Sequence, residues 1–352
     1  MALTFTVRRR DPELVRPAAP TPRETKRLSD IDGLVGFRTQ QPVMFFYRGE
    51  RRPTADDDDP AGVIRRALGE ALVPYYPFAG RLREVEARRL VVDCTGEGVL
   101  FVEADADVRL AELKAADRRL PFPCADQLLC DDDAQGSASL FNCPLLLIQG
   151  GFVLVVRLNH AICDAIGLVQ FLSAMTELAR GLPAPTVVPS WSRELLEALP
   201  HHEPDAAADV PPPLMMTASP PAPGDDMVTL VRAIRSGLPA SLRDTATSFE
   251  VLTSALWRAH TAALELPPHE DALLVFICNV RGVPELALPA GYYGNACVPV
   301  RVLTTVEALV AGSLEDTVEM VREAKKTVTA EYVRSVVALG VRWPTRPAGR
   351  RR

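Results

Sequence analysis

The residues with the clearest chemical potential lie in the segment NHAICDAIG, residues 159–167, where three residues separate His160 from Asp164. This spacing alone is weak evidence. With 5 histidines in the chain, an Asp four positions after one of them arises by chance in about 30% of such sequences. Because an imidazole titrates close to neutral pH, His160 is nevertheless chemically suited to act as a general base.

The predicted elements around His160 are stronger evidence than the spacing. Residues 145–160 read LLLIQGGFVLVVRLNH, in which two apolar runs joined by Gly150 and Gly151 predict a β-hairpin with a buried second strand. A helix is predicted to follow and to end at Gly181 and Pro183, because apolar residues recur on one face: Leu168, Phe171, Leu172, Met175, Leu178 and Ala179. His160 would therefore lie at a strand-to-helix turn, where open α/β structures present side chains to ligands.

The remaining elements also mix strands and helices. Asp59 and Pro60 predict the start of one helix, and Thr247 with Glu250 forms a capping-box pattern that predicts another. A further apolar stripe predicts a helix over 309–321. Strands are predicted over residues 41–47, 90–92, 99–102, 227–234, 273–278 and 297–302. The fold class is therefore α/β.

The length and the distribution of proline predict the domain organisation. A chain of 352 residues suggests two domains. Residues 183–226 are rich in proline and show no period, which predicts a linker between a domain at 1–182 and a second domain at 227–341, followed by a basic tail at 342–352. His201 and His202 lie within this linker, so we expect them to be solvated rather than catalytic.

Composition argues against several classes of function. The net charge of -6 disfavours nucleic acid as the main partner. No apolar run approaches the roughly 18 residues that span a bilayer, and the first residues lack a secretory signal, so we expect a cytoplasmic protein. The 7 cysteines are irregularly spaced without a CxxC pair, which predicts reduced thiols. The acidic run from Asp56 to Asp59 lacks the pattern of a calcium loop, so no metal site is expected.

Several segments together resemble the plant BAHD family of acyl-CoA-dependent acyltransferases. The resemblance covers nearly all of residues 4–341 and is closest to the subgroup of benzyl alcohol O-benzoyltransferases and taxane O-acetyltransferases. It is carried by LSDID at 28–32, LVPYYPFAGRL at 72–82, the NHAICDAIGLVQF segment with its HxxxD motif, FEVLTSALWR at 249–258, NVRG at 279–282 and AGYYGN at 290–295.

The resemblance implies a fold and a reaction. The fold would consist of two domains similar to chloramphenicol acetyltransferase, each with a mixed sheet and flanking helices. Acyl-CoA would be the co-substrate, with no permanently bound cofactor, and a small alcohol or amine would be the acceptor of a monomeric enzyme. His160 would remove the acceptor's proton, and the acceptor would attack the thioester and expel CoA without an acyl-enzyme.

The resemblance also implies roles for other residues. Asp164 would turn away from the channel and pair with Arg281, a brace for the turn that carries His160. Cys163, next to the HxxxD aspartate, would be a structural thiol rather than a nucleophile. The substrate channel would be lined or supported by Tyr292, Tyr293 and Asn295. The CoA arm would contact Ser248 and Thr253 near a helix N-terminus.

Two features depart from the family pattern. The hairpin is several residues shorter between Gln149 and Gly150, so its register could change the face from which His160 emerges. The family's DFGWG motif is absent and the likeness ends near Val341, which predicts an incomplete second domain. An alternative function therefore stays open: a catalytically impaired relative that binds or regulates, or that has no function. A serine hydrolase is disfavoured because the chain has no G-x-S-x-G elbow.

Overall fold

The computed structural model describes residues 5–46, 59–108, 112, 141–144, 146–150, 153–198 and 225–342. The chain forms two compact units. Unit 1 comprises Met1–Ala198, Ala287–Ala296 and Gly340–Arg352, and unit 2 comprises Leu199–Leu286 and Cys297–Leu339. The stretch 287–296, which the sequence analysis placed in the second domain, therefore belongs to unit 1.

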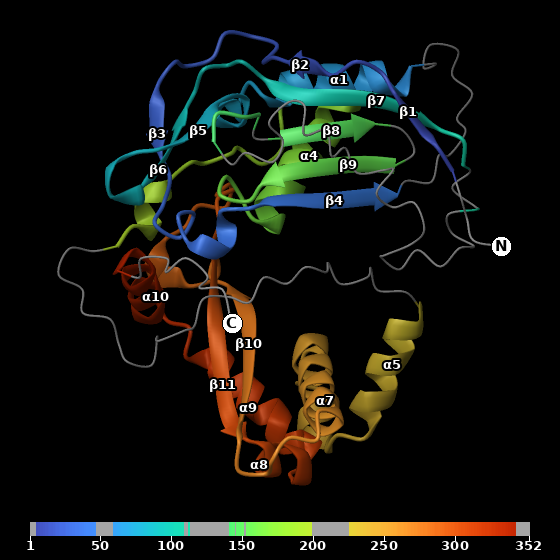
Figure 1. Cartoon of the computed structure of the whole chain (residues 1–352), viewed down its shortest axis with the longest axis vertical. Coiled ribbons are helices and arrows are strands. Elements are labelled where there is room, and N and C mark those ends of the chain that lie inside the picture. Colours follow the sequence, from blue (N-terminus) through green and yellow to red (C-terminus); the bar gives the residue numbers. More distant parts are fainter. Residues whose placement is uncertain are drawn as a thin grey trace, which may run out of the picture. The chain divides into compact units, whose positions relative to one another are not determined.

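Unit 1 contains a mixed six-stranded sheet (Figure 1). Its order is β1-β7-β8-β9-β4, and β2 also pairs with β7. The pairing of β7 with β8 is parallel and the other pairings are antiparallel. The strands are β1 (Val7–Arg9), β2 (Glu13–Val15), β4 (Gln40–Phe46), β7 (Val99–Ala106), β8 (Leu146–Gly150) and β9 (Val153–Asn159). A separate antiparallel sheet joins β3 (Thr25–Arg27), β6 (Leu90–Asp93) and β5 (Arg81–Glu84).

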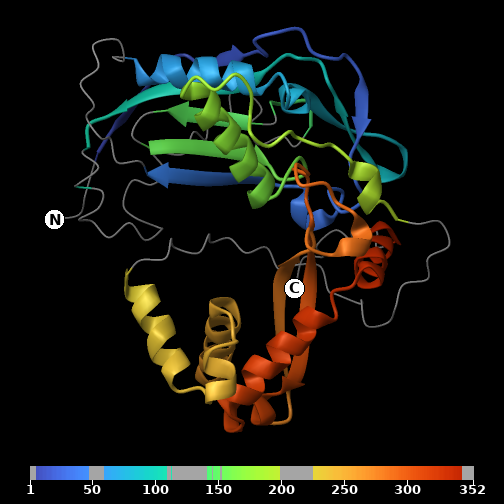
Figure 2. The same cartoon turned by 180° about the vertical axis from the view of Figure 1, so that it is seen from behind.

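Two helices, α1 (Pro60–Ala71) and α4 (Ala165–Ala179), cover the same face of the large sheet (Figures 1 and 2). The Asp59 side chain caps α1 by accepting from the Gly62 amide, as its sequence predicts. The core between helices and sheet includes the fully buried rings of Tyr75, Phe78 and Phe171. Short 3₁₀ turns complete the unit: η1 (Val35–Phe37), η2 (Tyr76–Ala79), η3 (Glu86–Arg88) and η5 (Arg193–Leu196).

Unit 2 packs helices against a two-stranded antiparallel sheet of β10 (Asp271–Asn279) and β11 (Cys297–Thr305). Its core includes Trp257, Val300, Leu309 and Val321. The Thr247 capping box is present and opens α7. The helices are α5 (Asp225–Ser236), α6 (Ala240–Arg243), α7 (Ser248–Ala263), α8 (Val306–Ala311), α9 (Leu314–Lys326) and α10 (Ala330–Arg342), with a 3₁₀ turn η7 (Pro284–Leu286). None of these helices, nor any other in the described ranges, is long and apolar enough to cross a membrane.

Most predicted elements are confirmed, but the strand predicted over 227–234 is wrong. This segment belongs to the helix α5. Its β-branched residues favoured a strand, yet Met227, Leu230, Val231 and Ile234 have the i, i+3, i+4, i+7 spacing of a helix. The single helix predicted over 309–321 is also wrong, because the chain forms α8 and α9 on either side of Gly312, with Ser313 capping α9.

The predicted linker is only partly irregular. Residues 183–198 pack within unit 1, where the Trp191 indole N–H donates to the Arg27 carbonyl at 3.0 Å and Arg193 is buried. Residues 199–224 lie outside the described residues, and with them the expectation for His201 and His202. The same holds for Asp56–Asp58, for Gly151 in the hairpin turn and for the tail from residue 343.

Candidate active site

The backbone on both sides of the His160 side chain is held by hydrogen bonds. Strands β4 and β9 pair Gln40 with Asn159, and the His160 N–H continues this ladder by donating to the Thr39 carbonyl at 2.9 Å. The imidazole is half-buried and stacks on the Phe37 ring, with centroids 4.9 Å apart and an interplanar angle of 26°. The strand register thus fixes where the imidazole leaves the sheet.

The Asp164 carboxylate binds backbone amides at the start of α4. One oxygen accepts from the Gly167 N–H at 2.9 Å and caps the helix, and the other accepts from the Ala296 N–H at 3.0 Å. The His160 Nδ1 atom is buried and has no hydrogen-bond partner in the described parts of the chain, so no hydrogen bond joins it to Asp164 there. Arg281 lies in unit 2, and its pairing with Asp164 stays a prediction.

The turn between His160 and Asp164 has its carbonyls occupied by two side chains. The Asn295 amide donates to the carbonyl of His160 at 2.8 Å and to that of Ala161 at 3.4 Å. Arg193 donates from Nη2 to the carbonyl of Ile162 at 2.7 Å. The carbonyls of residues 160–162 therefore all have side-chain donors, although they belong to neither the strand nor the helix.

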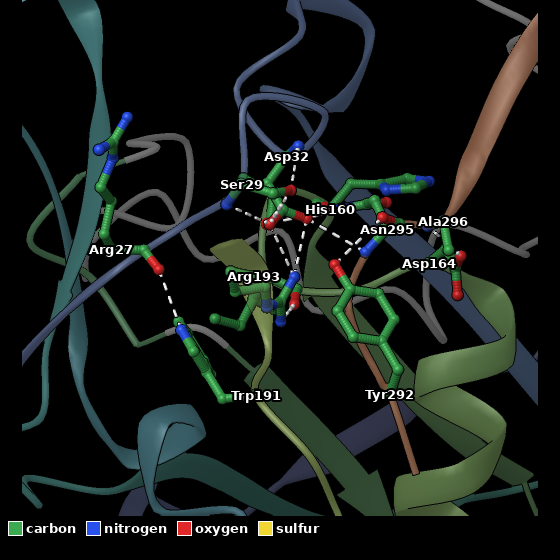
Figure 3. Close-up of polar contacts among 12 residues, drawn as sticks. Arg27, Ser29, Asp32, His160, Asp164, Trp191, Arg193, Tyr292, Asn295 and Ala296 are labelled. Atoms are coloured by element: carbon green, nitrogen blue, oxygen red, sulfur yellow. Dashed lines mark hydrogen bonds and ion pairs between the residues drawn. The ribbon is translucent and has the colours of Figure 1, made fainter. Parts of the chain in front are cut away.

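Asp32 connects these two side chains (Figure 3). Its carboxylate accepts from Arg193 Nη1 at 2.7 and 2.8 Å, from the Asn295 side chain at 2.8 Å and from the Asn295 backbone N–H at 3.1 Å. The Ser29 backbone and hydroxyl donate to the same carboxylate at 2.9 and 2.7 Å. Asp32 is 0% exposed, so this charge is compensated by donors rather than by water.

The Arg193 guanidinium is only 1% exposed and is enclosed by aromatic rings. It lies 4.5 Å from the centroid of Trp191, 5.5 Å from that of Tyr292 and 5.3 Å from that of Tyr293. Burial by itself would lower the Arg193 pKa, but the Asp32 carboxylate, together with smaller contributions from Tyr292, Tyr293 and Cys163, outweighs this effect, and the net pKa lies above the ordinary value. Arg193 is therefore a permanent cation inside unit 1.

Five of the predicted site residues lie together in unit 1. They are His160, Asp164, Tyr292, Tyr293 and Asn295. The two tyrosines and Asn295 are at most 2% exposed and so lie in the core of unit 1. Asn295 donates directly to the turn, and the position of these residues along a substrate channel stays a prediction. Cys163 is 0% exposed, in keeping with the structural role expected of its thiol.

Ser248 and Thr253 lie on α7 in unit 2. Ser248 is exposed and its hydroxyl accepts from Arg235 at 3.3 Å, while Thr253 is half-buried. The first turn of α7 already carries the carboxylate of Glu250, which pairs with Lys325 at 2.6 Å. The contact of Ser248 and Thr253 with CoA stays a prediction.

Sequence reasoning missed Asp32 and Arg193. Asp32 belongs to the LSDID segment, which helped to indicate the family. The apolar neighbours Leu28 and Ile31 are a pattern that could have indicated a buried carboxylate. No sequence pattern indicated a structural role for Arg193, because it follows a proline-rich stretch typical of linkers. Only the packing of 191–193 in unit 1 identifies it.

Sequence comparisons decide which family this site belongs to. The sequence matches the profile described as "Transferase family" over residues 5–343. Benzyl alcohol O-benzoyltransferase from Petunia hybrida is 47% identical, and the enzyme of that name from Nicotiana tabacum is 46% identical. Both alignments cover 96% of this chain and 75% of the relative. The chain belongs to the BAHD acyltransferase family. The (Z)-3-hexen-1-ol acetyltransferase from Arabidopsis thaliana is a further similar BAHD sequence, 45% identical over 96% of this chain and 76% of the relative.

Solved structures confirm the predicted BAHD fold class. Vinorine synthase superposes with a TM-score of 0.62 at 21% identity, covering 91% of this chain and 76% of that chain. The F. graminearum TRI101 protein, solved with coenzyme A and deoxynivalenol, gives a TM-score of 0.68 at 12% identity, with coverages of 91% and 78%. At these identities the likeness concerns the fold.

Proposed function

We propose that this BAHD protein transfers an acyl group from acyl-CoA to the oxygen of an alcohol, or to the nitrogen of an amine, with His160 as the general base. The observation that carries the proposal is the half-buried imidazole at the end of β9, whose backbone is held by Thr39 and Asn295. The relatives at 45–47% identity are named for acyl transfer to alcohols.

The proposed reaction needs one proton acceptor. A neutral His160 ring accepts the proton of the acceptor hydroxyl through one nitrogen, and the oxygen forms a bond to the thioester carbonyl carbon. The tetrahedral intermediate then collapses, the carbon–sulfur bond breaks, and the leaving CoA thiolate takes up the proton from the imidazolium, which leaves His160 neutral again. Holding both substrates beside a fixed imidazole replaces a bimolecular encounter, which supplies several kcal/mol.

The other predicted residues would support this step. In the proposal, Asp164 fixes the start of α4 and pairs with Arg281, while Ser248 and Thr253 contact the CoA arm. The coenzyme A in the TRI101 structures supports acyl-CoA as the co-substrate of this chain.

The test uses the purified full chain with benzoyl-CoA or acetyl-CoA and benzyl alcohol, with the ester measured by chromatography. We expect His160→Ala to lower kcat/KM by about 10²–10⁴-fold, the usual contribution of a general base. His260→Ala is the matched control, because His260 is exposed on α7 in unit 2, and its activity should equal that of the wild type. Unchanged turnover in a folded His160→Ala protein contradicts the proposed base.

A second measurement separates an inactive protein from a binding one. Thermal unfolding is followed with and without CoA, because a ligand that binds only the folded state raises the transition temperature. An upward shift without ester formation favours the alternative of a binding relative. If no ester forms and CoA does not raise the transition temperature, the proposed use of acyl-CoA is contradicted.

A further inference from the structure

The ion pair of Asp32 and Arg193 lies in the core of unit 1, where burying two charges carries a large desolvation cost. Both side chains are at most 1% exposed, and the Arg193 Nε is buried without a hydrogen-bond partner in the described residues. Buried ion pairs of this kind commonly stabilise a fold no more than apolar residues of similar volume. A contribution to stability alone therefore does not explain this pair.

The partners of the pair show what it orients. Asp32 binds both donors of the turn, since Arg193 and Asn295 each donate to it and also to a carbonyl between His160 and Ile162. Because Arg193 Nη1 donates to both oxygens of Asp32, the planar guanidinium is held in one orientation, in which Nη2 points toward the Ile162 carbonyl. The His160 ring stacks on Phe37, so a displacement of the turn that carries it would move the ring relative to Phe37.

The same network ties together four distant parts of the sequence. Residues 29–32, 160–164, 191–193 and 292–296 all supply groups to it (Figure 3). A side chain added at Gly294 would collide with the Arg193 guanidinium, which shows how closely the last segment packs on it. The part of the predicted linker that follows Pro189 is therefore a component of the site.

We propose that Arg193 and Asn295, both oriented by Asp32, are positioning residues that set the direction of the His160 imidazole. This inference rests on the proposed function for its kinetic readout, and on the structure alone for its spectroscopic readout. None of the three side chains takes part in proton transfer; they hold the carbonyls from which the catalytic turn is built.

Two variants test the proposal in the full chain. Arg193→Lys keeps the cation beside Asp32 but loses the planar fork that reaches the Ile162 carbonyl. The double variant Arg193→Met, Asp32→Asn removes both charges at similar volume, so that no buried charge is left unpaired. The control is Arg258→Lys, because Arg258 also donates to backbone carbonyls, those of Leu309, Val310 and Ser313, but lies in unit 2.

The kinetic expectation is a loss in kcat rather than in binding. For both Arg193 variants we expect kcat to fall by roughly 10²-fold, the effect of a displacement of about 1 Å at a reacting group. KM should stay within about twofold, because substrate contacts are unchanged. Arg258→Lys should match the wild type in both constants.

The spectroscopic expectation concerns the ring itself, without substrate. In protein labelled at histidine ring carbons, the His160 resonance is assigned by its loss in His160→Gln. We expect this resonance to move in both Arg193 variants, because the ring shifts relative to the Phe37 ring 4.9 Å away, while the exposed His260 and His269 resonances stay in place.

The outcomes distinguish the two proposals. A folded Arg193 variant with an unchanged His160 resonance overturns the positioning role, whatever its activity. A shifted resonance in a protein whose wild type makes no ester supports the positioning role and contradicts only the proposed function. A fall in kcat with an equal fall in Arg258→Lys also overturns the inference, because it would reflect general stability.

Discussion

Gly167 offers the sharpest test of how the His160 turn is built. It lies in the first turn of α4, and its N–H donates to Asp164 at 2.9 Å. A Cβ at this position would lie 2.8 Å from the Tyr293 carbonyl carbon and 2.9 Å from the Cys163 Cβ, and nearer still to the Tyr293 carbonyl oxygen. The substitution Gly167→Ala therefore pushes the added methyl group, and with it α4, against the backbone carbonyl of Tyr293.

Two opposing effects set the magnitude. Alanine is favoured over glycine within a helix by about 1 kcal/mol. Carbon atoms in contact prefer a separation of at least about 3.5 Å, so α4 and the 292–296 segment must separate by roughly 0.7 Å or more. Overpacking of this kind costs up to about 3 kcal/mol. We expect a net destabilisation of about 2 kcal/mol, and a fall in kcat of roughly 10²-fold because the turn between Asp164 and His160 moves with the helix.

The assay is urea unfolding followed by circular dichroism, together with ester formation under saturating substrate. Gly237→Ala is the matched control, since the nearest atom to its added Cβ is the Ile234 carbonyl oxygen at an ordinary 3.5 Å, and its stability should change by less than about 0.5 kcal/mol. A Gly167→Ala protein as stable as the wild type, or more so, would refute the reasoning: helix propensity would then outweigh the close approach of Tyr293.

Three further predictions concern a thiol, an ion pair and a helix cap. Burial raises the pKa of the Cys94 thiol to about 12, so Cys94 should escape iodoacetamide at about pH 8 in the folded protein and react in urea; peptide mass spectrometry after labelling checks this, and rapid native labelling would contradict it. Burial raises the pKa of Glu250, but the hydrogen bonds from Lys325 and the Thr247 amide, together with the charges of Lys325 and Arg322, outweigh it, and the net pKa lies below the ordinary 4.5. The charged form therefore stabilises the fold at neutral pH and loses this effect as the pH falls through the folded pKa. Glu250→Gln should lower the free energy of unfolding by about 2 kcal/mol near pH 7. Urea titrations should show this difference shrinking below pH 4.5, and a difference that stays constant would disprove the prediction. Ser313 caps α9 through the Asp316 amide at 3.0 Å, so Ser313→Ala should lose about 1 kcal/mol by the same titration, with Ser313→Thr as the variant that retains the cap.

Several helices were predictable because their signals are local. The apolar stripe of α4, the Asp59 cap and the capping box at Thr247 each depend on residues a few positions apart. The segment 227–234 shows the limit of such signals, since valine and isoleucine favoured a strand while their spacing fits the helix that forms. Here two local rules disagreed, and the periodicity was the better guide.

The sequence by itself determined the family and the turn that carries His160, because motif and periodicity are contained within short stretches of chain. Only the tertiary structure decided what holds that turn. Asp32 and Arg193 are separated in sequence by 161 positions, and a buried charge is recognisable only once its partner and its surroundings are known. Composition assigned Arg193 to a linker, whereas packing places it at the centre of the network that holds the His160 turn.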